Sequence, residues 1–310
     1  MTSPAIQPPS FEKRFLAPTF WPTWLGIALL YIFSWLPIRV LRVFAKGIAW
    51  LLRKLVKKRV NVARRNLALT FPDMPHSERE VLLQRHLECA GMAVFELAIG
   101  WWAPAWRIRR LGEVEGFEHV ERIIAQGKGV FALALHNMNL ELACRILGYH
   151  HPSIAFYRKH NNPLIDYMQY HGRNRSNKYM IHKRNARALI NALDQGELCL
   201  YLPDQDYGRA QSVFVPFGGV AETATTGATL MFARRANCIP LIVTSQYTRS
   251  GYKVKFYPPL LTFADKEDTQ ALTDLNKDIE SIVKEQPESY LWMHKRFKTR
   301  PQESDPSLYD

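Results

Sequence analysis

The sequence predicts an α/β fold with a central, mostly parallel sheet flanked by helices, preceded by an N-terminal membrane-anchor helix. After Trp106, short apolar runs typical of strands alternate with helical patterns, and this alternation indicates a parallel sheet. Near the N-terminus, an uncharged apolar run is followed by a stretch rich in Lys and Arg. We therefore expect a tail and anchor over 1–38, a basic amphipathic arm over 39–72, and an α/β domain over 73–310.

The charge of the chain is concentrated at its N-terminal end. The 310 residues carry a net charge of +13, with 47% apolar and 22% charged residues, which is ordinary for a globular protein. Residues 1–72 hold twelve basic residues and one acidic residue, and residues 73–310 hold 29 and 27. The four cysteines have no metal-ligand spacing and fit a reducing compartment.

The apolar run at 15–38 contains no charged residue. A bilayer span needs about 20 apolar residues, and the run reaches that length only if Pro18 and Pro22 are included. We expect either a short single span or a deeply seated interfacial helix. The basic residues that follow place the rest of the chain on the cytoplasmic face of the membrane.

Residues 39–56 have the pattern of a basic amphipathic helix. Such a helix beside an apolar segment is typical of attachment to an anionic membrane surface, and the alternative is a buried helix with a solvated basic face. No zinc finger, helix-turn-helix or RNP motif accompanies the charge, so we do not expect nucleic acid as a partner.

The α/β domain begins with a helix that the capping box at Ser77 and Glu80 predicts, running toward Trp101. Apolar runs then predict strands, and helical patterns lie between them. The expected strands are 130–135, 153–157, 197–202, 238–245 and 252–257, and the expected helices are 139–149, 163–175, 184–195, 222–236 and 268–286. Ligands of such sheets bind beyond the carboxyl ends of the strands.

The clearest chemical signal is His136, which directly follows the apolar run 130–135. Histidine is a natural general base near neutral pH, and a carboxylate on its other ring nitrogen fixes the tautomer. Glu141 lies five residues later, at the start of a helix, and is the expected partner. No nucleophilic Ser or Cys elbow is present, so His136 would act directly on a substrate hydroxyl. The alternative is a structural His beside a helical Glu.

Basic and polar residues gather after the strand expected at 153–157. Arginine and lysine at strand ends suit phosphate or a developing oxyanion, and the alternative is a solvated basic loop. The candidates are Arg158, which would serve an oxyanion or a phosphate, and the substrate-binding residues Arg173, Arg175, Asn177 and Lys178.

Two carboxylates, Asp204 and Asp206, follow the strand expected at 197–202. They either bind a metal, act in acid–base chemistry or shape a turn. Because no third ligand is visible, we expect a positioning role and no metal. Phe217 and Gly218 lie in a Gly-containing turn, which is expected to precede a helix and to bind an anionic group. The aromatic and basic tail at 290–300 either covers the site, touches the bilayer or is a docked terminal segment.

With these residues assembled, the chain resembles the late acyltransferases of bacterial lipid A biosynthesis, and among them the lauroyl type. The resemblance covers nearly the whole chain. It is carried by FWPTWLG at 20–26, RRNL at 64–67, FPD at 71–73, His136 with LEL at 140–142, FYR at 156–158, NPL at 162–164, RNRSNK at 173–178, DQDYG at 204–208, SVFVP at 212–216 and YLWMHKRFKTRP at 290–301.

The resemblance implies a glycerolipid-acyltransferase fold and transfer of a fatty acyl chain, laurate or similar. The donor would be acyl carrier protein with its phosphopantetheine-linked chain, with no other cofactor, and the acceptor a 3-hydroxyacyl hydroxyl of Kdo-lipid IVA at the inner membrane. Two departures affect the donor or acceptor: Asn-Met-Asn at 137–139, where the lauroyl type has Phe-Leu-Thr, and Gln205, where His is common. The alternatives are an acyltransferase for another glycolipid or a glycerophospholipid, and a non-catalytic membrane adaptor that binds carrier protein.

Overall fold

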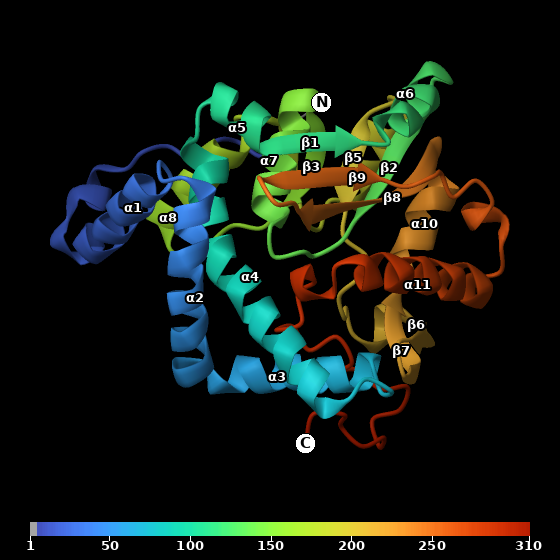
Figure 1. The fold of residues 1–310 in the computed structure, drawn as a ribbon. Helices are drawn as coiled ribbons and strands as arrows, with labels where there is room; N and C mark the ends of the chain where they lie inside the picture. The colour runs from blue at the N-terminus through green and yellow to red at the C-terminus, as the bar shows by residue number, and fades with distance from the viewer. Residues whose placement is uncertain (1–4) are drawn as a thin grey trace.

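A seven-stranded sheet forms the centre of the computed structural model, which describes residues 5–310 (Figure 1). The strand order is β1-β9-β8-β2-β5-β3-β4. Strands β8, β2, β5, β3 and β4 are parallel, and β9 runs antiparallel to β8. The strands are β1 (Gly112–Glu115), β2 (Gly129–Ala134), β3 (Ser153–Tyr157), β4 (Asn177–His182), β5 (Leu198–Tyr201), β8 (Cys238–Tyr247) and β9 (Tyr252–Phe256), and a separate antiparallel hairpin contains β6 (Ser212–Phe217) and β7 (Val220–Thr226).

Helices surround this sheet, which confirms the predicted α/β class. The α-helices are α1 (Trp21–Phe33), α2 (Ile38–Leu55), α3 (Lys57–Thr70), α4 (His76–Trp102), α5 (Ala105–Leu111), α6 (Phe117–Ala125), α7 (Leu140–His150), α8 (Pro163–Arg173), α9 (Ala186–Asp194), α10 (Ala228–Arg235) and α11 (Asp268–Glu285). Short 3₁₀ segments lie at Lys13–Leu16, Pro18–Phe20, Arg209–Gln211, Phe263–Asp265 and Pro287–Ser289.

The sheet is buried on both faces because its central strands are apolar throughout. On β2, Phe131 and Leu133 contribute to a core shared with α9, α10 and α11, whereas Val130, Ala132 and Ala134 face a second core with α6 and α7. Successive strand residues point to opposite faces, so a continuous apolar run fits a strand covered on both sides.

The long helix α4 joins the N-terminal helices to this domain. Its first half packs in the first core with α3, through Val60, Ala63 and Leu67, and its second half packs in the other core with α2. Gly91 of α4 lies directly against the backbone of Ala45 in α2, where any Cβ would clash. The predicted basic arm is therefore helical and packed, and the boundary at residue 72 stays a prediction.

Of the two alternatives expected for the run at 15–38, the membrane span finds no support within the described residues, and the interfacial helix stays a prediction. The run at 15–38 is divided into two 3₁₀ turns, α1 and a bend at 34–36 before α2. Helix α1 has 13 residues, or about 20 Å at 1.5 Å per residue, whereas the hydrocarbon core is about 30 Å thick. Within residues 5–310, no helix combines the length and the apolar character that crossing a bilayer requires.

Three local predictions also need correction. Residues 222–226 belong to β7 rather than to a helix, because they pair with β6. The predicted helix after residue 76 is confirmed as α4, but Pro75 is its cap and no side chain caps it. Asn177 and Lys178, for which a solvated basic loop is the alternative to substrate binding, begin strand β4, which pairs with β3. Residues 222–226 form a strand because they pair with β6 across a short turn, and residues 177–182 because they pair with β3; the apolar pattern of either segment does not show this pairing.

Candidate active site

His136 and Asp204 form a close pair at the carboxyl edge of the parallel strands. His136 follows β2 by two residues, Asp204 follows β5 by three, and β2 and β5 are neighbours in the sheet. The Nδ1 atom of His136 lies 2.6 Å from Oδ1 of Asp204, and the backbone N–H of His136 donates to Oδ2 at 2.8 Å. One carboxylate therefore fixes both the ring and the backbone of the histidine.

The environments of the two side chains differ. Asp204 is buried, whereas the His136 side chain is 21% exposed. Burial raises the pKa of Asp204, but the charge and the hydrogen bonds of His136 outweigh it, so the pKa of Asp204 is lowered overall. A carboxylate at Nδ1 selects the tautomer with its proton there, which leaves the lone pair on Nε2. Among residues 5–310, no group hydrogen-bonds to Nε2, and the histidine can take a proton from a ligand.

The C-terminal segment holds the histidine loop in place. The backbone N–H of Leu291 donates to the carbonyl of His136 at 2.9 Å, and the Tyr290 hydroxyl donates to the carbonyl of Asp204 at 3.1 Å. From the other side, Asn137 donates to Ser245 O at 2.6 Å. The tail at 290–300 is therefore docked against the loop, one of the three alternatives expected for it, and Asn137 links that loop to the end of β8.

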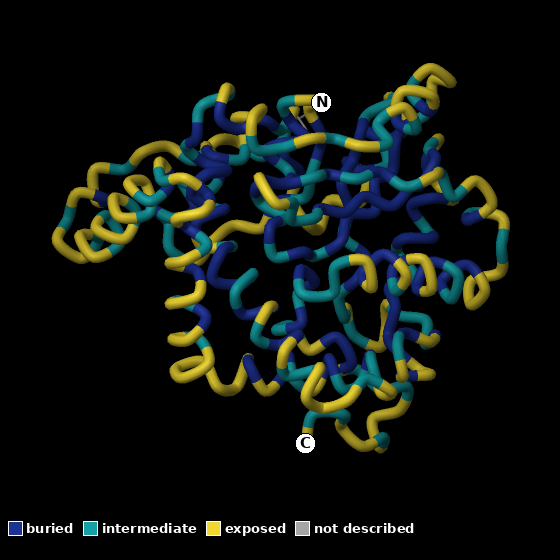
Figure 2. Tube along the Cα trace, in the orientation of Figure 1, coloured by how far each residue is buried: buried dark blue, intermediate teal, exposed yellow. Residues whose placement is uncertain are grey.

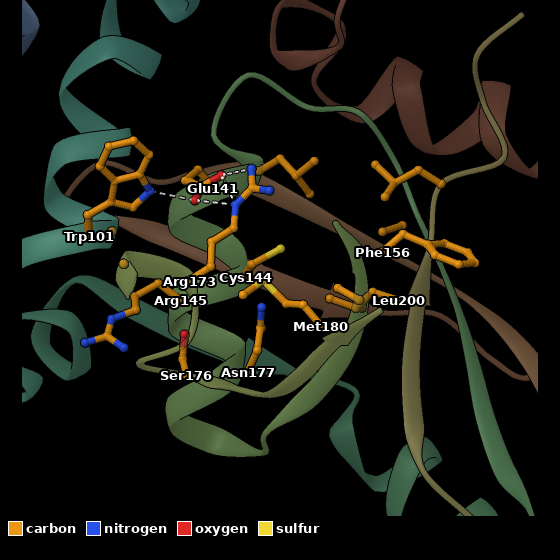
Figure 3. A pocket seen from close by; sticks show the side chains of 16 residues that line it. Trp101, Glu141, Cys144, Arg145, Phe156, Arg173, Ser176, Asn177, Met180 and Leu200 are labelled. Carbon is orange, nitrogen blue, oxygen red and sulfur yellow. Dashed lines mark hydrogen bonds and ion pairs between the residues drawn. The ribbon is translucent and has the colours of Figure 1, made fainter. Parts of the chain in front are cut away.

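Glu141, the expected partner of His136, forms a different cluster (Figure 3). The Trp101 indole N–H donates to Oε1 at 2.8 Å, and Arg173 binds both carboxylate oxygens, with Nη2 at 2.7 Å from Oε2. Burial raises the pKa of Glu141, and Arg173 and Trp101 reverse this to a lowered pKa. The predicted His136–Glu141 hydrogen bond is wrong for this structure because α7 directs Glu141 toward α4 and α8.

An apolar pocket of about 110 Å³ adjoins this cluster. It lies between α7, α8 and strands β2, β3 and β5, and Figure 3 shows the side chains that line it. Ala134 and Leu140, which bracket the His136 loop, are part of its lining, as are Phe156, Met180 and Leu200. The pocket therefore extends from the histidine loop into the apolar interior.

The other cations predicted to bind substrate are mostly engaged within the protein. Arg173 pairs with Glu141, Arg175 donates to the backbone carbonyl of Trp101 at 2.6 Å, and Lys178 pairs with Glu197. Asn177 lines the apolar pocket. Arg158 is exposed just after β3, two strands from β2 in the sheet, and its role stays a prediction.

The turn residues predicted to bind substrate are structural. Phe217 is fully buried against Phe297, and the backbone N–H of Gly218 donates to Glu280. Gly218 has a φ of 58° and lies against Thr70, so it is the turn of the β6–β7 hairpin. Their predicted binding role is wrong because the hairpin packs this turn onto α3 and α11.

A broad cationic groove lies on the other side of Asp204. It has a volume of about 960 Å³ between α3, the loop after β5 and the C-terminal segment. Asp206 lines it but is bonded to Thr299, so its role is to join the loop to the tail. The basic lining comprises Lys58, Arg59, Arg65, His294, Lys295 and Lys298. The pKa of His294 is lowered by burial and by the charge of nearby His136.

Sequence reasoning identified His136 but missed its partner and this groove. The available signal was the place of Asp204 just after an apolar strand, like that of His136. The sequence does not give the strand order, so it could not show that β2 and β5 are neighbours. The cations of α3 and of the tail lie more than 200 residues apart, and no local pattern connects them.

The chain is similar to known proteins along nearly its whole length. The sequence model described as "Bacterial lipid A biosynthesis acyltransferase" matches residues 8–299. A "Lipid A biosynthesis acyltransferase" of Haemophilus influenzae is 41% identical over 97% of this chain and 98% of its own length. Two Escherichia coli proteins, a "Lipid A biosynthesis palmitoleoyltransferase" and a "Lipid A biosynthesis lauroyltransferase", are each 39% identical, over 96% and 97% of this chain and 98% and 99% of their own lengths.

This chain also aligns with a more distant solved structure, the 1-acyl-sn-glycerophosphate acyltransferase PlsC of Thermotoga maritima. The alignment covers 84% of this chain and 97% of the PlsC chain. Its sequence identity is 16% and its TM-score is 0.38. The fold class rests on the sheet itself and not on this similarity.

The fold, the site and these relatives define an acyltransferase. More particularly, the chain belongs to the bacterial lipid A biosynthesis acyltransferase family.

Proposed function

We propose that this enzyme transfers a fatty acyl chain, laurate or similar, from acyl carrier protein to a 3-hydroxyacyl hydroxyl of Kdo-lipid IVA. The observation that carries the proposal is the Asp204–His136 pair, which leaves a lone pair on Nε2 of His136, in a loop whose flanking residues Ala134 and Leu140 line the apolar pocket. The carrier's phosphopantetheine arm brings the acyl chain, and the reaction uses no other cofactor.

The chemistry is direct transfer. Nε2 of His136 takes the proton of the acceptor hydroxyl, and the hydroxyl oxygen attacks the thioester carbonyl. When the tetrahedral intermediate collapses, the C–S bond breaks and the ester bond remains. The imidazolium returns the proton to the leaving thiolate, which departs as the carrier's thiol. Asp204 stabilises the imidazolium during this cycle. Arg158 is a candidate for the oxyanion or for a substrate phosphate.

The two cavities beside the histidine suit the two parts of the substrate pair. The apolar pocket suits one part of the acyl chain, since Leu140, Phe156 and Leu200 contribute hydrocarbon to its walls. The cationic groove fits the phosphorylated saccharide of the acceptor. It combines lysines with the hydroxyl-bearing rings of Tyr207 and Tyr309, and its one carboxylate is already bonded to Thr299.

The inner membrane, on its cytoplasmic face, is the proposed location. Exposed apolar side chains on α1 and α2 support attachment at the membrane surface, in the manner of an interfacial helix pair. Figure 2 shows both helices with long exposed stretches. The most exposed of these side chains are Trp21, Leu25 and Ile32 of α1 and Val43, Trp50 and Leu55 of α2.

The test is turnover by the purified full-length protein in detergent micelles, with lauroyl acyl carrier protein and Kdo-lipid IVA. We expect His136→Ala to lower kcat by about 10²–10⁴-fold, because the general base is lost. His76→Ala, an exposed histidine at the start of α4, is the matched control and keeps full activity.

Activity of His136→Ala within a factor of two of the original would contradict the mechanism. Lysophosphatidic acid is offered in place of Kdo-lipid IVA, and a preference for it would overturn the acceptor. Myristoyl and palmitoleoyl carriers are compared with the lauroyl carrier, and the highest kcat/KM identifies the donor.

A further inference from the structure

A second basic cavity lies where the bend between α1 and α2, the start of α2 and helix α5 meet the loop between β8 and β9. Its volume is about 520 Å³. Four arginines contribute to its walls, Arg39 from α2, Arg107 and Arg110 from α5, and Arg249 from the loop. These segments are far apart in the sequence, and Figure 1 shows α1, α2 and α5 together on one side of the molecule, away from α11 and the β6–β7 hairpin.

The four arginines of this cavity differ in their burial and in their partners. Arg107 is buried and its guanidinium donates to the carbonyls of Ser34 and Leu36, so it holds the bend between α1 and α2. Arg39, Arg110 and Arg249 are exposed, and within residues 5–310 none of their guanidinium groups has an ion-pair partner. No Asp or Glu lines the cavity. Unneutralised arginines around one concavity suit an anion with several oxygen acceptors.

The rim of the same cavity is apolar and aromatic. Trp35 is 49% exposed and Trp106 is 62% exposed, and both line the cavity. The exposed apolar residues of α1 and α2, including Ile32 and Val40, continue from this rim. Tryptophan is enriched where apolar chains meet polar headgroups. A soluble phosphate would contact only the arginines, whereas a phospholipid would contact both the arginines and the apolar rim.

We propose that this cavity binds the phosphate of an anionic phospholipid, with the lipid's acyl chains along the exposed faces of α1 and α2. An anionic headgroup such as phosphatidylglycerol fits better than phosphatidylethanolamine, because the cavity has no carboxylate for an ammonium group. The bound lipid fixes how the enzyme lies on the membrane. This inference rests on the proposed attachment to a membrane surface and not on the acyl-transfer mechanism.

The test is sedimentation of the purified full-length protein with vesicles of phosphatidylcholine alone or with 30% phosphatidylglycerol, a fraction of about one lipid in three chosen to mimic an anionic surface. The variant is Arg39→Gln, Arg110→Gln and Arg249→Gln combined. We expect it to lose at least about tenfold in partitioning to the anionic vesicles, since each surface cation contributes about 1 kcal/mol. Its partitioning to phosphatidylcholine vesicles stays unchanged.

The control removes the same charge elsewhere, through Arg187→Gln, Lys277→Gln and Lys284→Gln, which are exposed on α9 and α11. An equal loss of binding to anionic vesicles in this control would show that binding depends on net charge alone. That result would overturn the proposed site. So would unchanged binding by the arginine variant, with circular dichroism showing that it is folded.

A separate titration follows tryptophan fluorescence with dihexanoyl phosphatidylglycerol and with glycerol phosphate. We expect saturable binding of the short-chain lipid that Trp35→Phe and Trp106→Phe alter. Equal affinity for glycerol phosphate would identify a free-phosphate site and overturn the lipid assignment. Acyl transfer by the triple arginine variant to acceptor in micelles is measured separately. This assay tests the proposed function independently of lipid binding.

Discussion

Asp204 is the residue on which the chemistry of His136 depends. It accepts hydrogen bonds from both the ring and the backbone of the histidine, and its own backbone carbonyl accepts from Tyr290. Its burial keeps water from competing for the carboxylate. The ring of His136 is therefore fixed in one orientation before any substrate arrives, which lowers the cost of reorganisation during proton transfer.

Asp204→Asn is expected to lower kcat by about 10²–10⁴-fold, because an amide can favour the wrong tautomer and does not stabilise the imidazolium. The side chain keeps its size, so the fold and KM for both substrates change little. The measurement is steady-state kinetics with circular dichroism of the purified variant.

Asp206→Asn is the matched control, since Asp206 is two residues away and bonds Thr299 instead of His136. If the Asp204 variant retained the activity of the Asp206 variant, the dyad assignment would be wrong. The residual role of Glu141 would then need to be tested in the same assay.

At the scale of elements, helix α3 packs in the core with one side and lines the cationic groove with another. Its apolar side, with Val60, Ala63 and Leu67, packs in the core, and its basic side lines the groove beside the catalytic loop. Arg64 forms an ion pair with Glu80 of α4, whereas Lys58 has no ion-pair partner among the described residues. Three of the twelve basic residues at 1–72, Lys58, Arg59 and Arg65, therefore line the groove, and the others lie elsewhere.

The double variant Lys58→Gln and Lys298→Gln is expected to raise KM for Kdo-lipid IVA roughly tenfold, equivalent to about 1.4 kcal/mol of lost binding. Both lysines are exposed and line the groove from opposite sides, so the fold is preserved. We expect kcat and KM for acyl carrier protein to stay unchanged.

The control is Lys277→Gln with Lys284→Gln on α11, which removes the same charge at exposed positions outside the groove. A rise in KM for the carrier protein alone would assign the groove to the carrier and refute the acceptor assignment.

At the scale of the whole molecule, the packing of α4 against the sheet buries a carboxylic acid. Glu96 is fully buried, the Tyr247 hydroxyl donates to its Oε2 at 3.2 Å, and Oε1 has no partner among residues 5–310. Burial raises the pKa of Glu96 to about 8. The folded protein therefore keeps a proton here that the unfolded chain loses near pH 4.3.

Between those two pKa values the folded state binds more protons, so the free energy of unfolding falls as pH rises. The contribution of Glu96 is up to about 1.4 kcal/mol per pH unit, and it levels off above pH 8. Glu96→Gln is expected to flatten this dependence and to stabilise the protein at pH 8. Urea unfolding at pH 5, 6.5 and 8 measures it, with exposed Glu78→Gln as control. A parallel pH dependence in both variants would contradict the assignment.

The sequence by itself determined the α/β class, the strand positions near 130–135 and 153–157, and the family, and it singled out His136, whose role as general base is proposed. These depend on local apolar runs, on a residue's place after a strand, and on ordered motifs, all of which lie along the chain. It did not determine that residues 222–226 pair with β6 in a hairpin or that the run at 15–38 bends before α2, since pairing and bending depend on contacts that the apolar pattern of one segment does not contain.

Only the tertiary structure decided which carboxylate hydrogen-bonds to His136 and which cations form ion pairs within the protein. Glu141 is nearer in sequence, but α7 turns it toward Arg173, whereas the adjacency of β2 and β5 brings Asp204 to the histidine ring. Lys178 is neutralised by Glu197, and Lys58 and Lys298 meet at one groove from opposite ends of the chain. The physical reason is that strand order and helix packing are long-range outcomes of burying the core, and local sequence does not encode them.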